Sequence, residues 1–126
     1  MRLLLDTQIM LWQISDDKRL SGRLRDCLID PDNVKIVSDV SSWEVVIKNR
    51  TGKLDISLEA FEAEVRYNEY ERLPIVRSHF ARLLKIPIIH RDPFDHLLIA
   101  QAQVEKLSVL TADRKFKDYA VTLAVT

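Results

Sequence analysis

The sequence is poor in the residues that mark stapled, disordered or turn-rich proteins. Its 126 residues include two glycines, four prolines and one cysteine. So little glycine and proline argues against a disordered chain, a collagen-like chain and an all-β fold with many tight turns. Because Cys27 is the only cysteine, the chain has no internal disulfide, and nothing indicates an oxidising compartment.

The chain also lacks a long apolar run and an excess of either charge. No apolar stretch approaches the ~18 residues of a membrane span, and the three leucines before Asp6 are too few for a signal peptide. The 19 basic and 19 acidic residues cancel, so no overall field steers the chain to nucleic acid or membrane. We therefore expect a soluble, cytoplasmic protein whose nucleic-acid binding, if any, needs local basic patches or cations.

Apolar residues, at 47% of the sequence, are arranged as strands that alternate with helices. The length predicts one domain over residues 1–126. We expect strands over 3–5, 34–38, 108–111 and 121–125, and an extended link over 73–75. We expect helices over 7–14, from 21 to before Pro31, and over 40–50, 57–69, 78–85, 92–106 and 112–119. This alternation predicts an α/β fold with a mainly parallel sheet and helices on both faces.

The helix expected over 40–50 carries an apolar stripe formed by Val40, Trp43, Val46 and Ile47. Glu44 lies at the border of this stripe. Spacing of this kind predicts that Trp43 belongs to the core or to an interface, and we expect the same of Trp12, in preference to stacking on bases.

Acidic residues lie where a parallel sheet places its sites, outside the carboxyl ends of the strands. Asp6 and Asp113 follow apolar strands, Glu44 lies in the helix after the 34–38 strand, and Asp95 opens the helix that leads to the 108–111 strand. Each acid has an ordinary structural alternative. Asp6 and Asp113 would cap helices, Asp95 would complement a helix dipole, and Glu44 would close a capping box with Ser41.

The side of the helix on which Asp95 lies favours a chemical role for this acid. It shares one stripe of its helix with Leu98 and Ile99, and a carboxylate on a core-facing stripe is costly unless it is paired or binds a metal. Carboxylates gathered in one cleft repel each other unless a cation lies among them. Oxygen ligands favour Mg²⁺ or Mn²⁺ over zinc, and the reaction class that follows is metal-assisted attack of water on a phosphodiester.

Motifs along the whole chain combine these acids in a characteristic order. They are Leu3–Thr7 with Leu11-Trp12, Ser42–Lys48, His90–Asp95, Leu97–Ala102, Leu110–Asp113 and Tyr119–Val121. In this order they resemble the PIN-domain ribonucleases, specifically the VapC-like toxins of bacterial toxin–antitoxin pairs. The Trp-Glu helix and the Asp-Pro-Phe-Asp helix are the most specific parts of the resemblance.

The resemblance implies a PIN-like three-layer α/β/α domain whose acidic site binds Mg²⁺ (or Mn²⁺). That site falls on Asp6, Glu44, Asp95 and Asp113. Auxiliary positions that hold acids or waters fall on Thr7, Asp92 and Thr111. Gln8 departs from the His that often follows Asp-Thr in this subgroup, which bears on a substrate contact and not on the metal site.

The activity implied is that of an endoribonuclease that cleaves RNA phosphodiester bonds with metal-activated water. Its partners would be an RNA substrate, a cognate antitoxin encoded next door and a second copy in a homodimer. Lys48, Arg114 and Lys115 lie near the acidic end of the sheet, where they would contact phosphates or form solvated faces.

Other classes fit the sequence less well. A phospho-accepting receiver domain needs an acid pair after its first strand and a Lys-Pro after its fifth, which this chain lacks. A non-catalytic α/β binding module has no need of all the acids. An RNA-processing nuclease of the same family without an antitoxin remains an alternative. The three histidines lack the spacing of a metal site on a helix, and we expect them to be surface or packing residues.

Overall fold

A computed structural model describes residues 1–125. In chain order its elements are β1 (Arg2–Leu5), α1 (Thr7–Ser15), α2 (Gly22–Ile29), β2 (Val34–Ser38), α3 (Asp39–Arg50), α4 (Leu58–Tyr67), β3 (Glu71–Leu73), α5 (Arg77–Leu83), α6 (Pro93–Glu105), β4 (Ser108–Leu110), the 3₁₀ helix η1 (Arg114–Asp118) and β5 (Thr122–Leu123).

The strands form one parallel sheet in the order β3-β2-β1-β4-β5. The first strand of the chain is therefore the central one, and Leu4 lies between Ile36 of β2 and Val109 of β4. Chain order runs outward from β1 to β2 and β3, and then crosses to β4 on the other side. This reversal places a topological switch point between β1 and β4, where α/β sheets bind their ligands.

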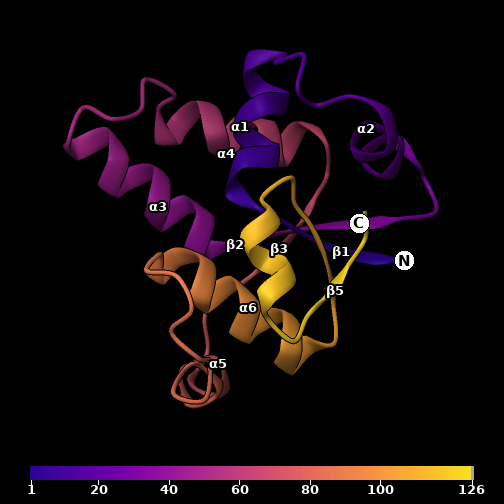
Figure 1. Cartoon of the computed structure of the whole chain (residues 1–126). Coiled ribbons are helices and arrows are strands. Elements are labelled where there is room, and N and C mark those ends of the chain that lie inside the picture. Colours follow the sequence, from indigo (N-terminus) through magenta and orange to yellow (C-terminus); the bar gives the residue numbers. More distant parts are fainter. Residues whose placement is uncertain (126) are drawn as a thin grey trace.

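Helices cover both faces of the sheet (Figure 1). Leu3 and Leu5 of β1 pack into a core with residues of α1, α2 and α4. Leu4, which points the opposite way, packs with α6 and with Phe116 of η1. Because side chains alternate along a strand, an unbroken run of three leucines supplies both cores. The predicted three-layer α/β/α class with a parallel sheet is confirmed.

Three sequence expectations differ from the structure. Residues 71–73 form an edge strand, whereas we expected only an extended link from 73 to 75. Trp43 is 45% exposed, because the buried side of α3 consists of Val40, Ser41, Glu44 and Val45. The indole instead lies edge-on against Phe94 of α6, with 4.7 Å between ring centroids. The expected strand 121–125 is also shorter, at Thr122–Leu123.

The start of α6 agrees with its sequence signals. Asp92 caps the helix by accepting hydrogen bonds from the backbone N–H groups of Phe94 and Asp95, and Pro93 occupies the first turn. The acidic cap satisfies free amides of the first turn. Proline is tolerated in this turn because an N–H there would have no partner within the helix. None of the helices among residues 1–125 is long and apolar enough to cross a bilayer.

Candidate active site

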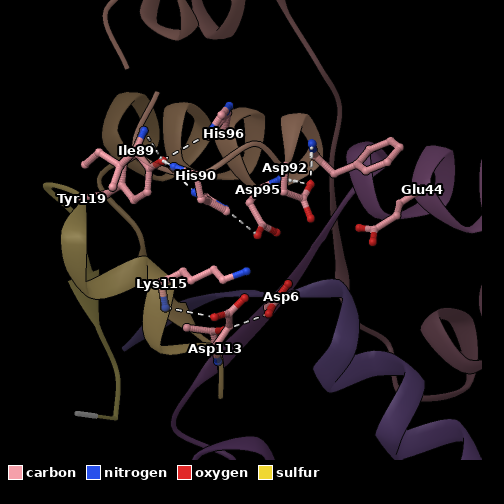
Figure 2. A network of polar contacts seen from close by, with 12 residues as sticks. Asp6, Glu44, Ile89, His90, Asp92, Asp95, His96, Asp113, Lys115 and Tyr119 are labelled. Carbon is pink, nitrogen blue, oxygen red and sulfur yellow. Dashed lines mark hydrogen bonds and ion pairs between the residues drawn. The ribbon is translucent and has the colours of Figure 1, made fainter. Parts of the chain in front are cut away.

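A cleft of about 260 Å³ opens at the carboxyl ends of the strands, beside the switch point between β1 and β4. All four of the predicted ligand positions line it. Its walls comprise Asp6, Gln8, Leu11, Trp12, Glu44, Lys48, Asp92, Asp95, Ala112 and Asp113. These residues come from α1, α3 and α6, from the caps of α1 and α6, and from the loop after β4, so distant segments of the chain build one acidic surface (Figure 2).

Asp6 lies at the junction of β1 and α1 and is 6% exposed. Its side chain makes no cap hydrogen bond to α1, so the ordinary explanation for this acid does not apply. The Thr111 hydroxyl instead donates to Asp6 Oδ2 at 2.8 Å. Asp6 N–H donates to Leu110 O at 3.0 Å, which extends the β1–β4 ladder to the edge of the cleft.

Two hydrogen bonds, one from its backbone and one to its side chain, hold Asp113 in place. Its N–H donates to Thr111 Oγ1 at 3.0 Å, and its Oδ1 accepts from Lys115 N–H at 2.9 Å as the cap of η1. The predicted cap is therefore present, together with a place in the cleft wall. Thr111 links the two acids at the switch point, because its one hydroxyl donates to Asp6 and accepts from Asp113.

Glu44 is 6% exposed and forms an ion pair with Lys48, one turn further along α3, at 2.6 Å between Oε2 and Nζ. The capping box with Ser41 is not formed, because the cap of α3 is Ser38. Burial opposes the charge on Lys48, but its hydrogen bond to Glu44 and the nearby acids outweigh burial and raise the pKa of the ammonium.

Asp95 faces the cleft from the first turn of α6 and is 7% exposed. Burial is the largest cause that raises its pKa to about 7, followed by repulsion from Asp92, Glu44 and Asp113. Burial also raises the pKa of Asp6 to about 7; repulsion from Asp95 adds to this, and the Thr111 hydrogen bond opposes it. The cleft therefore concentrates negative charge that its own cations do not balance.

The donor set suits a hard divalent cation, since every acidic side chain in the cleft offers carboxylate oxygens alone. Within residues 1–125, no three His, Cys, Asp or Glu side chains lie close enough together to enclose an ion. Carboxylates that share a cleft repel one another, and a cation bound between them would offset this repulsion. Asp6, Glu44, Asp95 and Asp113 would hold the ion, directly or through water.

The auxiliary and basic positions divide between the cleft and its surroundings. Asp92 lines the cleft as well as capping α6, whereas Thr7 is buried and bonds to Ser41 Oγ at 2.8 Å, joining α1 to α3. Lys48 is in the wall of the cleft. Arg114 and Lys115 are exposed on η1 and do not line the cleft, although η1 begins directly after Asp113.

Two residues beside the site, His90 and Tyr119, belong to the motifs of the sequence but were not predicted as part of the site. His90 Nε2 lies 3.0 Å from Asp95 Oδ2, and His90 Nδ1 lies 2.7 Å from the hydroxyl of Tyr119 (Figure 2). His90 precedes the Asp-Pro-Phe-Asp motif, so its position was the only available signal. The spacing of histidines along a sequence can predict metal ligands on one helix, but it cannot predict a contact between His90 and Tyr119.

Solved structures that share this fold include toxin–antitoxin proteins from three bacteria. VapBC2 from Rickettsia felis, bound to a DNA fragment from its promoter, is 17% identical, with a TM-score of 0.73 and coverage of 98% of this chain and 97% of that one. VapBC-1 from nontypeable Haemophilus influenzae is 16% identical, with a TM-score of 0.66 and full coverage of both chains. A toxin–antitoxin complex from Klebsiella pneumoniae is 15% identical, with a TM-score of 0.60 and coverage of 90% and 89%.

No curated protein matches this sequence. The model of the PIN domain matches residues 3–121, a span that contains every acid of the cleft and agrees with the resemblance predicted from the motifs. The chain belongs to the PIN-domain family, whose members are nucleases.

Proposed function

We propose that this chain is a Mg²⁺- or Mn²⁺-dependent endoribonuclease and the toxin of a toxin–antitoxin pair. The observation that carries the proposal is the convergence of Asp6, Glu44, Asp95 and Asp113 on one cleft at the switch point of the sheet. A bound cation would offset their repulsion, activate water and stabilise charge on the phosphate. Residues 1–126 would form one PIN domain.

The chain's own residues would position the substrate and the ion. The raised pKa values of Asp6 and Asp95 mean that ion binding displaces protons, so these acids become ligands as they ionise. Lys48 sets a positive charge beside the acids, where it suits an RNA phosphate. Arg114 and Lys115 extend that charge outside the cleft, where flanking phosphates would pass.

Cleavage of RNA by purified protein tests the proposal. We expect cleavage to stop in EDTA and to return with Mg²⁺ or Mn²⁺, and Asp6→Asn to remove it. Asp55→Asn provides the matched control, because Asp55 is exposed between α3 and α4 and does not line the cleft. Full activity in EDTA would contradict metal dependence, and activity on RNA unaffected by Asp6→Asn would contradict the site.

An antitoxin partner is supported by the likeness in fold to the toxin–antitoxin structures. Trp12 lines the cleft and also a second hollow of about 530 Å³ between α1, α2 and α4. An apolar side chain of an antitoxin helix would fit beside it and block the cleft. Expression of the chain in cytoplasm should arrest growth, and the small protein encoded next to it should relieve the arrest and co-purify with it.

We also propose the homodimer implied by the resemblance. Phe80, Leu84, Ile88 and Ile89 are each at least 52% exposed on α5 and the loop that follows. Exposed large apolar side chains favour contact with a second copy. Leu84→Lys should convert a dimer into a monomer in light scattering, whereas Lys85→Ala next to it should not. A wild-type monomer at micromolar concentration would contradict this assembly.

A further inference from the structure

A partly buried chain of polar contacts leads from Asp95 away from the cleft, and the proposed reaction does not use it. His90 lies in its middle, 3.0 Å from Asp95 Oδ2 through Nε2 and 2.7 Å from the Tyr119 hydroxyl through Nδ1. The side chains of His90 and Asp95 are 12% and 10% exposed. Figure 2 shows Tyr119, His90 and Asp95 in a row that ends at the acidic cleft.

The hydrogen-bond partners of the Tyr119 hydroxyl determine the direction in which its hydrogen points. Its oxygen accepts from Ile89 N–H at 3.1 Å and from His90 N–H at 3.0 Å. These two donors occupy both lone pairs of a phenolic oxygen, so the group has only its hydrogen left to offer. His90 Nδ1 at 2.7 Å is nearer to the oxygen than His96 Nε2 at 3.2 Å. The hydroxyl therefore donates to His90 Nδ1.

The proton on the His90 ring follows from this donation. A nitrogen that accepts a hydrogen bond carries a lone pair, so Nδ1 is unprotonated and the neutral ring bears its hydrogen on Nε2. That N–H points at Asp95 Oδ2. The opposite tautomer and the doubly protonated ring would each aim a third N–H at the Tyr119 oxygen, whose lone pairs are already used.

We propose that His90 is a positioning residue for Asp95, with its tautomer set by Tyr119. This inference rests on the proposed function. The Nε2–H group binds one oxygen of the carboxylate and fixes its rotation, which leaves the other oxygen free to bind a cation. Outer hydrogen bonds of this kind orient metal ligands. Because Tyr119 follows η1 and Asp113 precedes it, the same contact ties Asp95 to the opposite wall of the cleft.

The tautomer is measured on the metal-free protein by long-range ¹⁵N–¹H NMR of the histidine rings. For His90 we expect Nδ1 to resonate as an unprotonated nitrogen and Nε2 as a protonated one. Tyr119→Phe should abolish this pattern, and His96→Asn should leave it unchanged. A His90 ring that carries its hydrogen on Nδ1, or hydrogens on both nitrogens, would overturn the proposal.

Binding of Mn²⁺ tests the consequence with a matched pair of variants. The amide nitrogen of His90→Gln reaches about as far as Nε2, whereas that of His90→Asn ends near Nδ1. We expect His90→Asn to weaken Mn²⁺ binding ~10-fold or more, and His90→Gln to recover most of the loss. Melting curves establish that both variants are folded. Equal Mn²⁺ affinity in wild type and a folded His90→Asn would overturn the positioning role.

These readouts separate this inference from the proposed function. If wild type neither binds Mn²⁺ nor cleaves RNA, the proposed function fails, and the tautomer measurement still decides whether Tyr119 sets the His90 ring. If wild type cleaves RNA and both His90 variants bind Mn²⁺ as wild type does, only the role of His90 fails.

Discussion

At the scale of single residues, the hydroxyl group of Thr111 holds two of the acids in place. It donates to Asp6 and accepts from the backbone of Asp113. Thr111→Val keeps the shape and leaves both partners without this bond, so the free energy of unfolding should fall by about 1–3 kcal/mol. The pKa of Asp6 should rise further, because the lost bond lowers it. The rate of RNA cleavage should fall in this variant.

Thr111→Ser serves as the control, since it retains the hydroxyl. Urea unfolding and cleavage rates should place it near wild type. If Thr111→Val and Thr111→Ser are equally active, the hydroxyl does not support the acids.

Asp92 and Asp95 are three residues apart and should respond differently to substitution. Asp92→Ala removes the cap of α6 and should cost on the order of 1 kcal/mol of stability, with reduced but measurable cleavage. Asp95→Asn removes a buried charge that the neighbouring acids repel. It should abolish cleavage and leave the melting temperature unchanged or higher. If Asp92→Ala is inactive and Asp95→Asn still cleaves RNA, the metal ligand is Asp92 and not Asp95.

At the scale of elements, a buried amide away from the cleft joins α6 to the start of α3 and to α5. Gln101 of α6 accepts from the hydroxyl of Ser38, which caps α3, and its amide nitrogen lies 3.2 Å from His79 Nδ1 of α5. Gln101→Leu should lower the free energy of unfolding by about 1–3 kcal/mol, because buried partners lose their bonds.

Gln103→Leu is the control for this change, since the side-chain bond of Gln103 is exposed. Chemical denaturation should find it close to wild type. The cleavage rate per folded molecule should stay the same for Gln101→Leu, which does not touch the cleft. Equal stability of the two variants would contradict the role of the buried amide.

The elements also explain what the sequence could predict. Buried strands and capped helices carry their own signals, as the leucines of β1 and the Asp92-Pro93 start of α6 illustrate. β3 was missed as a strand because an edge strand needs little apolar surface, and Glu71 and Arg72 are exposed. Trp43 is not in the core, because α3 turns Ser41 and Glu44 inward instead. Its alternative place at an interface stays a prediction.

The acids of the cleft were predictable for a related reason. Asp6 and Asp113 follow strands, Asp95 lies in the first turn of α6, and Glu44 lies within the helix after β2. Parallel strands bring their carboxyl ends to one edge. The contact of His90 with Tyr119 depends on where a loop and the end of η1 meet, 29 residues apart. No local pattern encodes that distance, so only the folded chain reveals it.

At the scale of the whole molecule, stability should depend on pH and on metal together. Folded Asp6 and Asp95 have pKa values of about 7, against 3.8 for the ordinary side chain. Between these values the folded state binds more protons than the unfolded state, so these two acids make the metal-free protein less stable as pH rises from about 4 to 7. Above about pH 7, the contribution of these two acids to the free energy of unfolding does not return.

Divalent cations should reverse this trend, because they bind the ionised form of the folded state. Melting curves with and without Mg²⁺ should diverge as pH approaches 7, and Asp6→Asn should flatten the pH dependence without metal. An equal Mg²⁺ shift at pH 4 and pH 8 would show that these carboxylates do not bind the ion.

The pairing of β1 with β4 has a consequence for synthesis on the ribosome. Leu3–Leu5 pair with Ser108–Leu110, and Asp6 is bonded to Leu110 and Thr111. A nascent chain that has not yet released residue 111 from the exit tunnel lacks one wall of its cleft. If the proposed function holds, the cleft would therefore stay incomplete, and its activity on RNA absent, until residue 111 has left the tunnel.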